Sequence, residues 1–511
     1  MSQEAIRPPK SRVFRTRSKT GCRTCRTRRI RCDEFPVACK NCTSTGRKCD
    51  YDLHRLPVKR NLSLLPRSLL GRLHAWTLTS DERNCFAFFQ LQTVPGLAEV
   101  FDSPLWERFI LQQSSADPAV SHAVIMLGAI HQGAVMNRMR LSGSRPHNSH
   151  LNFSLEQSAR AFALLNRRHA FNDPQFYQTV LTCCLLFVMG DILQGNYEKA
   201  AMHVYHGVKL LNEGLAQGRV LDQFLVDVFK FLQIASALYA PSGSAEPFVT
   251  AGNPEWGTQT SPIIIHSIDS VRQALSETLN YGIALIGYTM RSPAAEVRAR
   301  YEDLWLAKQR ITSRYEQLVL AFDQHCRERI SPLSPKENRA AEVFRHVVLT
   351  QIVGLRLVFS DGLSTNHLTA DCATLLSSSL DIMAKMPKRT TFVMEPVVTV
   401  GLHMVATQSP DIHMRVQAIE ALRAWPHTEG MHNSEICAGI AMEALKAELR
   451  RMAENGEGSI VADFPEGRDQ FLVDVLESDQ NAASWATVRC SQFKIEDVLH
   501  QPDSDDDSPS M

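Results

Sequence analysis

The chain has 511 residues, with 55 Lys and Arg against 54 Asp and Glu and with 44% hydrophobic residues. This hydrophobic content can bury a large core, which excludes a wholly disordered chain. The charge is uneven, because residues 1–60 hold 17 Lys and Arg and five Asp and Glu, whereas the remainder holds 38 against 49. A basic head on an acidic body suggests that the head binds nucleic acid.

The first 19 residues form a basic arm without hydrophobic periodicity. We expect this arm, 1–19, to be disordered on its own. It contains no apolar stretch and no small-residue cleavage site of the kind found in signal peptides. It could contact the DNA backbone or serve as a nuclear address, and a plain solvated tail is the alternative.

Six cysteines follow with the spacing C-x2-C-x6-C-x6-C-x2-C-x6-C, in which the same half-unit occurs twice: Cys22, Cys25, Cys32, Cys39, Cys42 and Cys49. A structural zinc site has four ligands, so two zinc ions need eight ligand positions. Six cysteines fill eight positions only if two of them bridge both metals, and the twofold repeat favours one bridging cysteine from each half. One zinc would leave two thiols unused.

The alternative to metal is a disulfide framework, which belongs to secreted proteins and does not fit this N-terminus. The other cysteines are scattered in apolar or helical contexts. We expect them to be buried free thiols, as in a reducing compartment: Cys85, Cys183, Cys184, Cys326, Cys372, Cys437 and Cys490.

Residues 20–52 resemble the fungal Zn2Cys6 binuclear-cluster transcription factors. The resemblance rests on the six spacings, the basic run Arg26–Arg31, the Cys32-Asp33 pair, Pro36, and Gly46 and Tyr51 around the last cysteine. Arg31, where the family usually has Lys, and the position of Pro36, one residue early, are departures. The resemblance implies two Zn²⁺ ions per chain, with Cys22 and Cys39 as the bridging thiolates.

The resemblance also implies a double-stranded DNA partner at promoter sites. The short helix after Cys25 would enter the major groove, and Arg28 and Arg29 would face base edges, typically of a CGG triplet. Arginine bonded to guanine O6 and N7 is the commonest specific contact in that groove. Four further residues are predicted to hold phosphates, although each could be a solvated basic residue: Arg26, Arg31, Lys40 and Lys48.

The predicted linker, 53–79, bears on the oligomeric state. Its leucines keep no heptad register over three heptads, and Pro57 and Pro66 interrupt any continuous helix. The linker therefore does not predict a coiled-coil homodimer. The protein could bind as a monomer or dimerise through the body.

The body, 80–487, is predicted to be a large all-α domain, because apolar residues recur at three- and four-residue spacing. Residues 117–131 and 200–211 resemble two helices of the fungal-specific transcription factor domain, which implies a regulatory domain. The periodicity predicts helices over residues 118–136, 153–170, 176–193, 197–215, 222–239, 263–288, 294–327, 336–359, 370–386 and 434–453.

No catalytic motif occurs, such as a Walker loop, G-x-S-x-G or H-E-x-x-H, and we expect no enzyme. We interpret the histidine pairs His122/His131 and His203/His206 as structural histidines with satisfied hydrogen bonds, and Cys183-Cys184 as packing residues of the core. The apolar runs look too short or too interrupted to span a bilayer, so no membrane partner is expected.

The last segment, 488–511, alternates apolar and acidic residues and ends in an acidic run. Such a composition is typical of activation segments that recruit the transcription machinery, and a solubilising tail is the alternative. Together these features predict a small Zn2Cys6 metal-stabilised module followed by a large all-α domain. The predicted function is a nuclear, sequence-specific DNA-binding transcription factor, such as a regulator of a secondary-metabolite or nutrient-use gene cluster. A zinc-dependent protein-interaction or ligand-sensing regulator without sequence-specific DNA readout is the alternative.

Overall fold

The protein is described from a computed structural model. The residues that it describes are 22–33, 39–47, 49, 78–137, 149–168, 175–236, 263–329, 331–359, 365–386 and 388–454. The predicted arm 1–19, nearly all of the linker 53–79, Lys48, residues 455–487 of the predicted body, and the predicted tail 488–511 with Cys490 lie outside these ranges.

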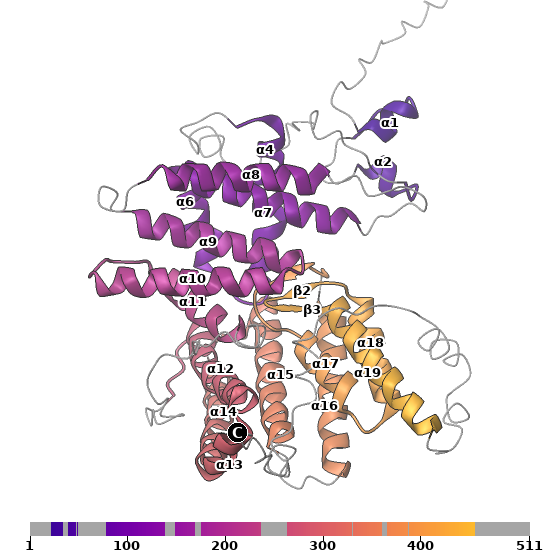
Figure 1. Ribbon diagram of the computed structural model, residues 1–511. Coiled ribbons are helices and arrows are strands. Elements are labelled where there is room, and N and C mark those ends of the chain that lie inside the picture. Colours follow the sequence, from indigo (N-terminus) through magenta and orange to yellow (C-terminus); the bar gives the residue numbers. More distant parts are fainter. Residues whose placement is uncertain are drawn as a thin grey trace, which may run out of the picture.

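The body begins with a group of helices that run mostly across the view of Figure 1. Helix α7 packs on α4, α6, α8 and α9, and α10 packs on α9 and α11. Short π-helical turns lie on either side of α5. The bounds are α4 Ser80–Phe88, η2 Phe89–Thr93, α5 Val94–Leu97, η3 Leu105–Phe109, α6 Ile110–Ala116, α7 Pro118–Asn137, α8 Ser149–Asn166, α9 Phe176–Leu193, α10 Tyr197–Ala216 and α11 Gln223–Ser236.

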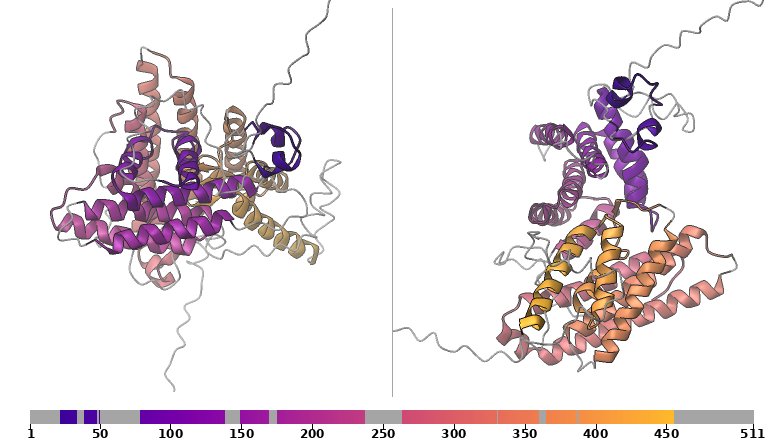
Figure 2. Two further views of the ribbon diagram at one scale, coloured as in Figure 1. Left: turned by 90° about the horizontal axis from the view of Figure 1, so that it is seen from above. Right: turned by 90° about the vertical axis from the view of Figure 1, so that its right-hand side faces the viewer.

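A second group forms a bundle in which α15 and α16 run down the view of Figure 1. The side view in Figure 2 shows the two groups as separate layers of helices. The prediction of a large helical body is confirmed for the residues of it that the structure describes, which also contain three short strands. The bounds are α12 Ile268–Arg291, α13 Ala294–Ala299, α14 Tyr301–Glu328, α15 Pro335–Val358, α16 Thr365–Lys385, α17 Thr399–Gln408, α18 Ile412–Ala424 and α19 Ser434–Glu454.

The predicted helix 294–327 is wrong in one respect, because the structure divides it into α13 and α14. Arg300 leaves the helical conformation at φ −111° and ψ 14°. Its guanidinium donates to the hydroxyl of Tyr288 over 2.9 Å and lies over that ring at 5.3 Å. The helix is thus interrupted at Arg300, where this residue contacts Tyr288 of α12. The hydrophobic periodicity of the sequence gives no sign of this interruption.

A small sheet, absent from the sequence prediction, separates two hydrophobic cores. It consists of β1 (Phe392–Val393), parallel to β2 (Thr428–Glu429), which pairs antiparallel with β3 (His432–Asn433). Because successive strand residues face opposite sides, Phe392 belongs to the core of the first helix group and Val393 to that of the second. Two-residue strands are too short to show a periodicity of two in a sequence.

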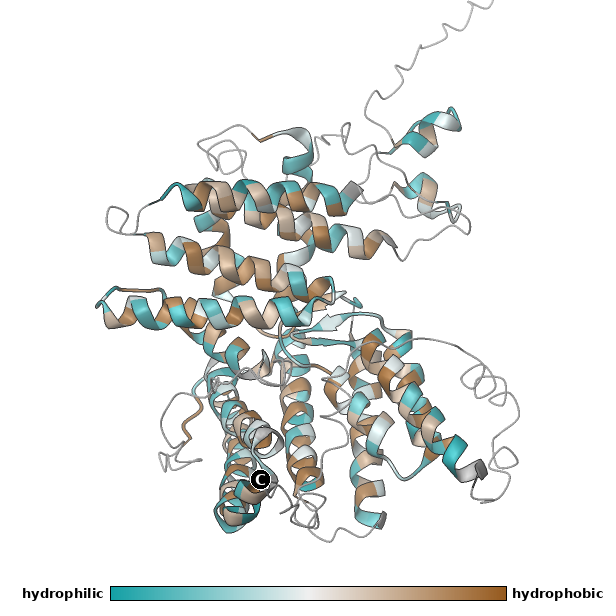
Figure 3. Cartoon of the chain, viewed as in Figure 1, coloured by the Kyte–Doolittle hydropathy of each residue, from teal (hydrophilic) through white to brown (hydrophobic). Residues whose placement is uncertain are grey.

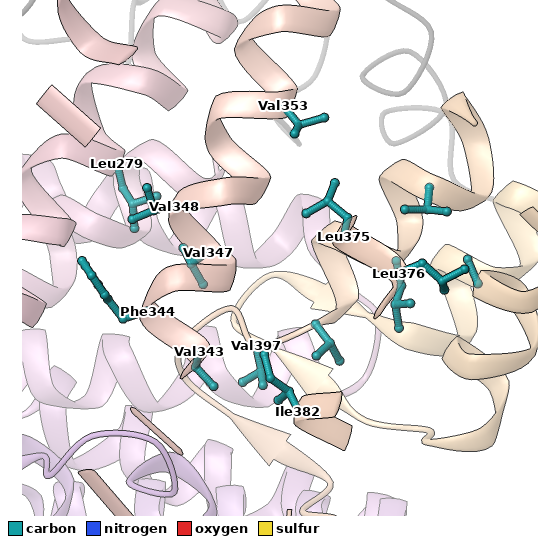
Figure 4. Close-up of a cluster of buried hydrophobic side chains, with 14 of the residues drawn as sticks. Leu279, Val343, Phe344, Val347, Val348, Val353, Leu375, Leu376, Ile382 and Val397 are labelled. Atoms are coloured by element: carbon teal, nitrogen blue, oxygen red, sulfur yellow. The ribbon is translucent and has the colours of Figure 1, made fainter. Parts of the chain in front are cut away.

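The apolar helix faces predicted from the sequence pattern are buried in the two hydrophobic cores. Apolar colour in Figure 3 concentrates on the helix faces turned toward neighbouring helices. Figure 4 shows part of the second core, where Phe344 and Val348 of α15 lie near Leu279 of α12, and all three are buried. Each helix is thus held by burial of its apolar face, at about 25 cal/mol per Å² of apolar surface.

Among the described residues, two core helices are long and apolar enough to cross a membrane, which corrects the expectation that the apolar runs are too short or interrupted. They are Pro118–Met136 in α7 and the whole of α9. Within them, 78% and 67% of the apolar window is buried inside the protein. Packing between other helices accounts for their composition, because a helix that is apolar all round suits a core as well as a bilayer.

Gly128 sets the approach of α7 to α4. A Cβ placed there would lie 2.3 Å from the carbonyl oxygen of Cys85, and backbone must move to accept it. We expect Gly128→Ala to lower the free energy of unfolding by about 1–3 kcal/mol through overpacking, although alanine favours helix. Gly354→Ala is the matched control, because its Cβ would meet only the flexible end of Met404 at 3.2 Å. Urea unfolding curves would contradict this account if Gly128→Ala were as stable as Gly354→Ala.

Candidate metal centre and nucleic-acid interface

The head consists of two similar halves whose equivalent residues are 17 positions apart, as Cys22 and Cys39 are. Each half starts a short helix, α1 (Arg23–Thr27) and α2 (Lys40–Thr43), directly after its first cysteine. The backbone N–H of Cys22 donates to Sγ of Cys32, and the N–H of Cys39 donates to Sγ of Cys49, over 3.4 and 3.1 Å. The repeat seen in the sequence is therefore also a repeat in structure.

The six cysteines come together as two overlapping sets of four sulfurs. Within each set, all Sγ atoms lie within 4.8 Å of one another, and Cys22 and Cys39 are the two residues common to both sets. The Sγ of Cys22 lies 3.7 Å from that of Cys39, and the Sγ of Cys25 lies 3.5 Å from that of Cys39. A tetrahedral zinc with Zn–S bonds of about 2.3 Å separates its sulfurs by about 3.8 Å. The donor set thus fits two zinc ions, each with four thiolates and no open position. The sets are Cys22, Cys25, Cys32, Cys39 and Cys22, Cys39, Cys42, Cys49.

Burial keeps these sulfurs protonated as thiols unless a cation displaces their protons. All six cysteine side chains are at most 8% exposed, and none forms a disulfide. Thiolate is the form that binds zinc, so metal binding must displace the thiol protons. Two Zn²⁺ and six thiolates sum to −2, which the surrounding arginines offset. Burial raises the thiol pKa of five of the cysteines, namely Cys22, Cys25, Cys39, Cys42 and Cys49.

Both short helices end in the same backbone motif, with one residue in the left-handed region. In the second half this residue is Gly46, at φ 62°, and in the first half it is Arg29, at φ 55°. The N–H groups of Arg29 and Ile30 bond to the carbonyls of Arg26 and Cys25, over 3.1 Å each. This is the Schellman motif, which usually has glycine at this position. Arginine there costs about 1–2 kcal/mol relative to the right-handed region.

The predicted DNA-binding residues occupy different environments. Arg29, Arg31 and Lys40 are exposed, and Arg26 is partly buried. Arg28 is also partly buried, and its guanidinium donates to the carbonyl of Asn41 over 3.2 Å and to the hydroxyl of Thr45 over 3.4 Å. Arg28 therefore joins the two halves of the head. Lys48 is not among the described residues.

Three residues that sequence reasoning did not assign a role also join the halves. Asn41 donates to the carbonyl of Arg31 over 2.8 Å. The carboxylate of Asp33 accepts the N–H of Lys40, the first residue of α2, over 3.1 Å, and Thr45 receives a bond from Arg28. The Cys32-Asp33 pair was visible in the sequence, but the partner across the cluster becomes evident only in the fold.

Three of the four histidines named above have side-chain partners in the structure, and His206 is exposed. Nδ1 and Nε2 of His131 bond to the hydroxyls of Thr93 and Thr391, over 2.8 and 2.6 Å. Nδ1 of His122 lies 2.7 Å from the side-chain oxygen of Gln157. Nε2 of His203 faces Asp191 at 3.7 Å. Among the described residues, the only clusters of metal-ligating side chains are the two cysteine sets of the head.

Comparison with known proteins agrees with this architecture. Residues 20–56 match the fungal Zn(2)-Cys(6) binuclear cluster domain, and residues 85–406 match the fungal specific transcription factor domain. The second match spans more than half of the chain, so the chain belongs to the family of proteins that carry the fungal specific transcription factor domain. The matched cluster domain holds two zinc ions, which is the number predicted from the cysteine spacing and accommodated by the two sulfur sets.

Several fungal regulators are similar to this chain. The aspercryptin biosynthesis cluster-specific transcription regulator atnN of Emericella nidulans is 24% identical over 349 residues, which are 62% of this chain and 55% of that protein. The transcription regulator lscL of Purpureocillium lilacinum is 24% identical over 259 residues, 44% of this chain and 58% of that protein. The transcriptional regulatory protein moc3 of Schizosaccharomyces pombe is 52% identical over 42 residues, 8% of each chain.

The chain thus spans just over half the length of the first two relatives. No solved structure matches it significantly.

Proposed function

We propose that this protein is a sequence-specific DNA-binding transcription regulator whose zinc cluster reads a CGG-like triplet in the major groove. The six cysteines of the two sulfur sets hold two zinc ions, with Cys22 and Cys39 bridging. Zinc folds the head, and the head presents its basic residues to DNA. Residues 20–52 are the DNA-binding module, and residues 80–487 form the regulatory domain.

The conformation of Arg29 is the observation that carries this proposal. Its counterpart in the second half is Gly46, which adopts the same left-handed conformation without the steric cost that a side chain brings. Strained backbone persists where surrounding structure enforces it and is concentrated at functional sites. An exposed arginine at this position offers five N–H donors beyond the end of α1, and guanine O6 and N7 are their matching acceptors.

Substitution of Arg29 by glycine tests the contact with a base without destabilising the head. Arg29→Gly removes the guanidinium and relieves the strain, so we expect the zinc-loaded head to be at least as stable as before. Discrimination between a CGG duplex and a duplex with a changed triplet should fall by about 1–3 kcal/mol, the value of one bidentate base contact. Fluorescence anisotropy with labelled duplexes measures both affinities.

Arg47→Gly is the control, because Arg47 is exposed and follows the left-handed residue of the second half. It should weaken binding to all duplexes about equally, as a phosphate contact does. Undiminished discrimination in Arg29→Gly would refute the assignment of Arg29 to a base. Equal affinity of the unmodified protein for both duplexes, with steep salt dependence, would favour a head that binds other proteins.

The partners and location follow from this proposal. A regulator of this kind acts in the nucleus, on promoter DNA, and is not an enzyme. Similarity to a biosynthesis cluster-specific regulator supports a role in one pathway's gene cluster. The acidic segment 488–511 is proposed to recruit the transcription machinery, and fusion to a foreign DNA-binding domain with a reporter tests that role. Binding as a monomer agrees with the prolines at 57 and 66.

A further inference from the structure

A cavity of about 210 Å³ lies where the two hydrophobic cores meet. Phe231 and Ala235 of α11 reach it from the first helix group, and Met431 belongs to the same core. Leu279 of α12, labelled in Figure 4, and Val358 of α15 reach it from the second. Most of its wall is apolar, and the cavity is partly open to the surface. A dry apolar cavity of about 150 Å³ already accepts benzene, so this one has room for a small bicyclic molecule.

One polar atom in the wall lacks a partner. Nε2 of His403, on α17, is buried and has no hydrogen-bond partner among the described residues. The other ring nitrogen, Nδ1, lies 3.2 Å from the carbonyl oxygen of Cys437. A carbonyl only accepts, so Nδ1 carries the proton and donates, and the neutral ring leaves a lone pair on Nε2.

Two other polar groups of the wall already have hydrogen-bond partners. The carboxylate of Glu429 accepts the backbone N–H groups of Val397, Val398 and Thr399 and a bond from His427. The hydroxyl of Thr350 donates to the carbonyl of His346 over 2.8 Å. Nε2 of His403 is therefore a buried acceptor in the wall that a bound molecule would satisfy, and an unsatisfied buried acceptor costs about 1–3 kcal/mol.

We propose that this cavity binds a small, mostly apolar molecule that donates a hydroxyl or N–H group to Nε2 of His403. Its walls come from α11, α12, α15, α17 and the β2–β3 turn, so a bound molecule contacts both cores. The site lies in the body, far along the chain from the zinc cluster, and the proposal does not depend on DNA binding.

The protonation state of His403 agrees with an accepting nitrogen. Burial, and then the neighbouring His432, lower the pKa of His403 to about 4. The ring is therefore neutral at physiological pH, and Nε2 accepts. A ligand that only accepts hydrogen bonds leaves Nε2 of His403 without a partner. Its binding free energy then comes only from the burial of its apolar surface.

Indole and benzofuran test the proposal, because they have the same shape and only indole carries an N–H donor. Each is titrated into the full-length, zinc-loaded protein by calorimetry, with saturation-transfer NMR for the weaker complex. We expect saturable binding of both, with indole about tenfold tighter. In His403→Leu, indole affinity should fall to that of benzofuran, whose own affinity stays unchanged and so shows that the cavity is intact.

Two further variants complete the test. Ala235→Phe fills the cavity and should abolish binding of both compounds, which keeps the proposal testable if His403→Leu does not fold. His206→Leu, at a histidine of α10 that does not line the cavity, should change neither affinity. Absence of saturable binding, equal affinity for the two compounds in the unmodified protein, or unchanged binding in Ala235→Phe would each overturn the proposal.

Discussion

Cys39→Ser is expected to leave the protein with less than one zinc ion per chain, whereas Cys49→Ser retains one. Cys39 belongs to both sulfur sets, so its loss leaves neither set with four thiolates. Cys49 belongs to one set only, and the set of Cys22, Cys25, Cys32 and Cys39 stays complete without it. Zinc contributes about 10–16 kcal/mol to the folding of small zinc-finger peptides. Loss of both ions should therefore unfold the head and abolish DNA binding.

Native mass spectrometry of the full chain counts the bound zinc directly. Cys437→Ser is the control, because Cys437 is a buried free thiol of α19 in the body. It should keep two zinc ions. If Cys39→Ser and Cys49→Ser lost the same number of ions, the bridging role of Cys39 would be wrong. A chelator should remove the ions while the body keeps its helical circular dichroism.

Glu429→Gln is expected to destabilise the body by about 3–5 kcal/mol, the effect of removing one partner from a buried ion pair. Glu429 is fully buried on β2. It accepts the N–H groups of Val397, Val398 and Thr399 at the start of α17, over 2.7, 3.0 and 3.0 Å. A carboxylate there also offsets the positive end of the helix dipole. A neutral amide replaces one acceptor oxygen by a donor, which then faces either His427 or these N–H groups.

His427 makes the carboxylate part of an ion pair. Its Nε2 lies 2.6 Å from Oε1 of Glu429, and its Nδ1 lies 2.6 Å from the carbonyl of Trp425. Both neighbours accept, so only the imidazolium makes both bonds at once. Trp425 stacks on this ring with centroids 4.0 Å apart, an arrangement that favours a cation.

The effect of Glu429→Gln should depend on pH. Burial alone raises the pKa of Glu429, but His427 and the backbone donors outweigh it and hold the pKa below the ordinary value of 4.5. A carboxyl with a lowered folded-state pKa contributes stability above its unfolded-state pKa and loses it as the pH falls through the folded-state value. The difference between Glu429→Gln and the unmodified protein should therefore be full at neutral pH and shrink in acid.

Urea unfolding at neutral and at acid pH measures this difference. Glu156→Gln is the control, because Glu156 is 55% exposed and its pair with Arg160 on α8 should contribute less than about 0.5 kcal/mol. If Glu429→Gln behaved like Glu156→Gln, the cap on α17 would not matter for stability.

The sequence predicts the metal centre better than any other part of the molecule. Cysteine spacing limits which sulfurs can meet, and the twofold repeat of the head leads to two metals with one shared ligand from each half. The long helices were also predictable, because α7, α9 and α10 carry periodic or continuous apolar residues over many turns. Residue spacing is a good predictor of a metal site, because few arrangements of six cysteines give each zinc ion four ligands.

Other features depend on contacts between distant segments. The left-handed conformation of Arg29 has no sequence signal, since glycine is the residue expected there and appears only at Gly46. The strands are two residues long, and in β1 Phe392 packs in one core and Val393 in the other. His403 is a single histidine in an apolar helix, and its unsatisfied nitrogen is visible only once α19 packs beside it.

Selection from random-sequence duplex DNA by the full-length, zinc-loaded protein at physiological salt tests the central claim most directly. We predict enrichment of CGG-like triplets, and loss of that enrichment in Arg29→Gly. The number and spacing of the enriched triplets would also distinguish a monomer, with one triplet, from a dimer, with two. A selected pool as random as the input, with two zinc ions bound, would contradict the claim that this head reads DNA sequence.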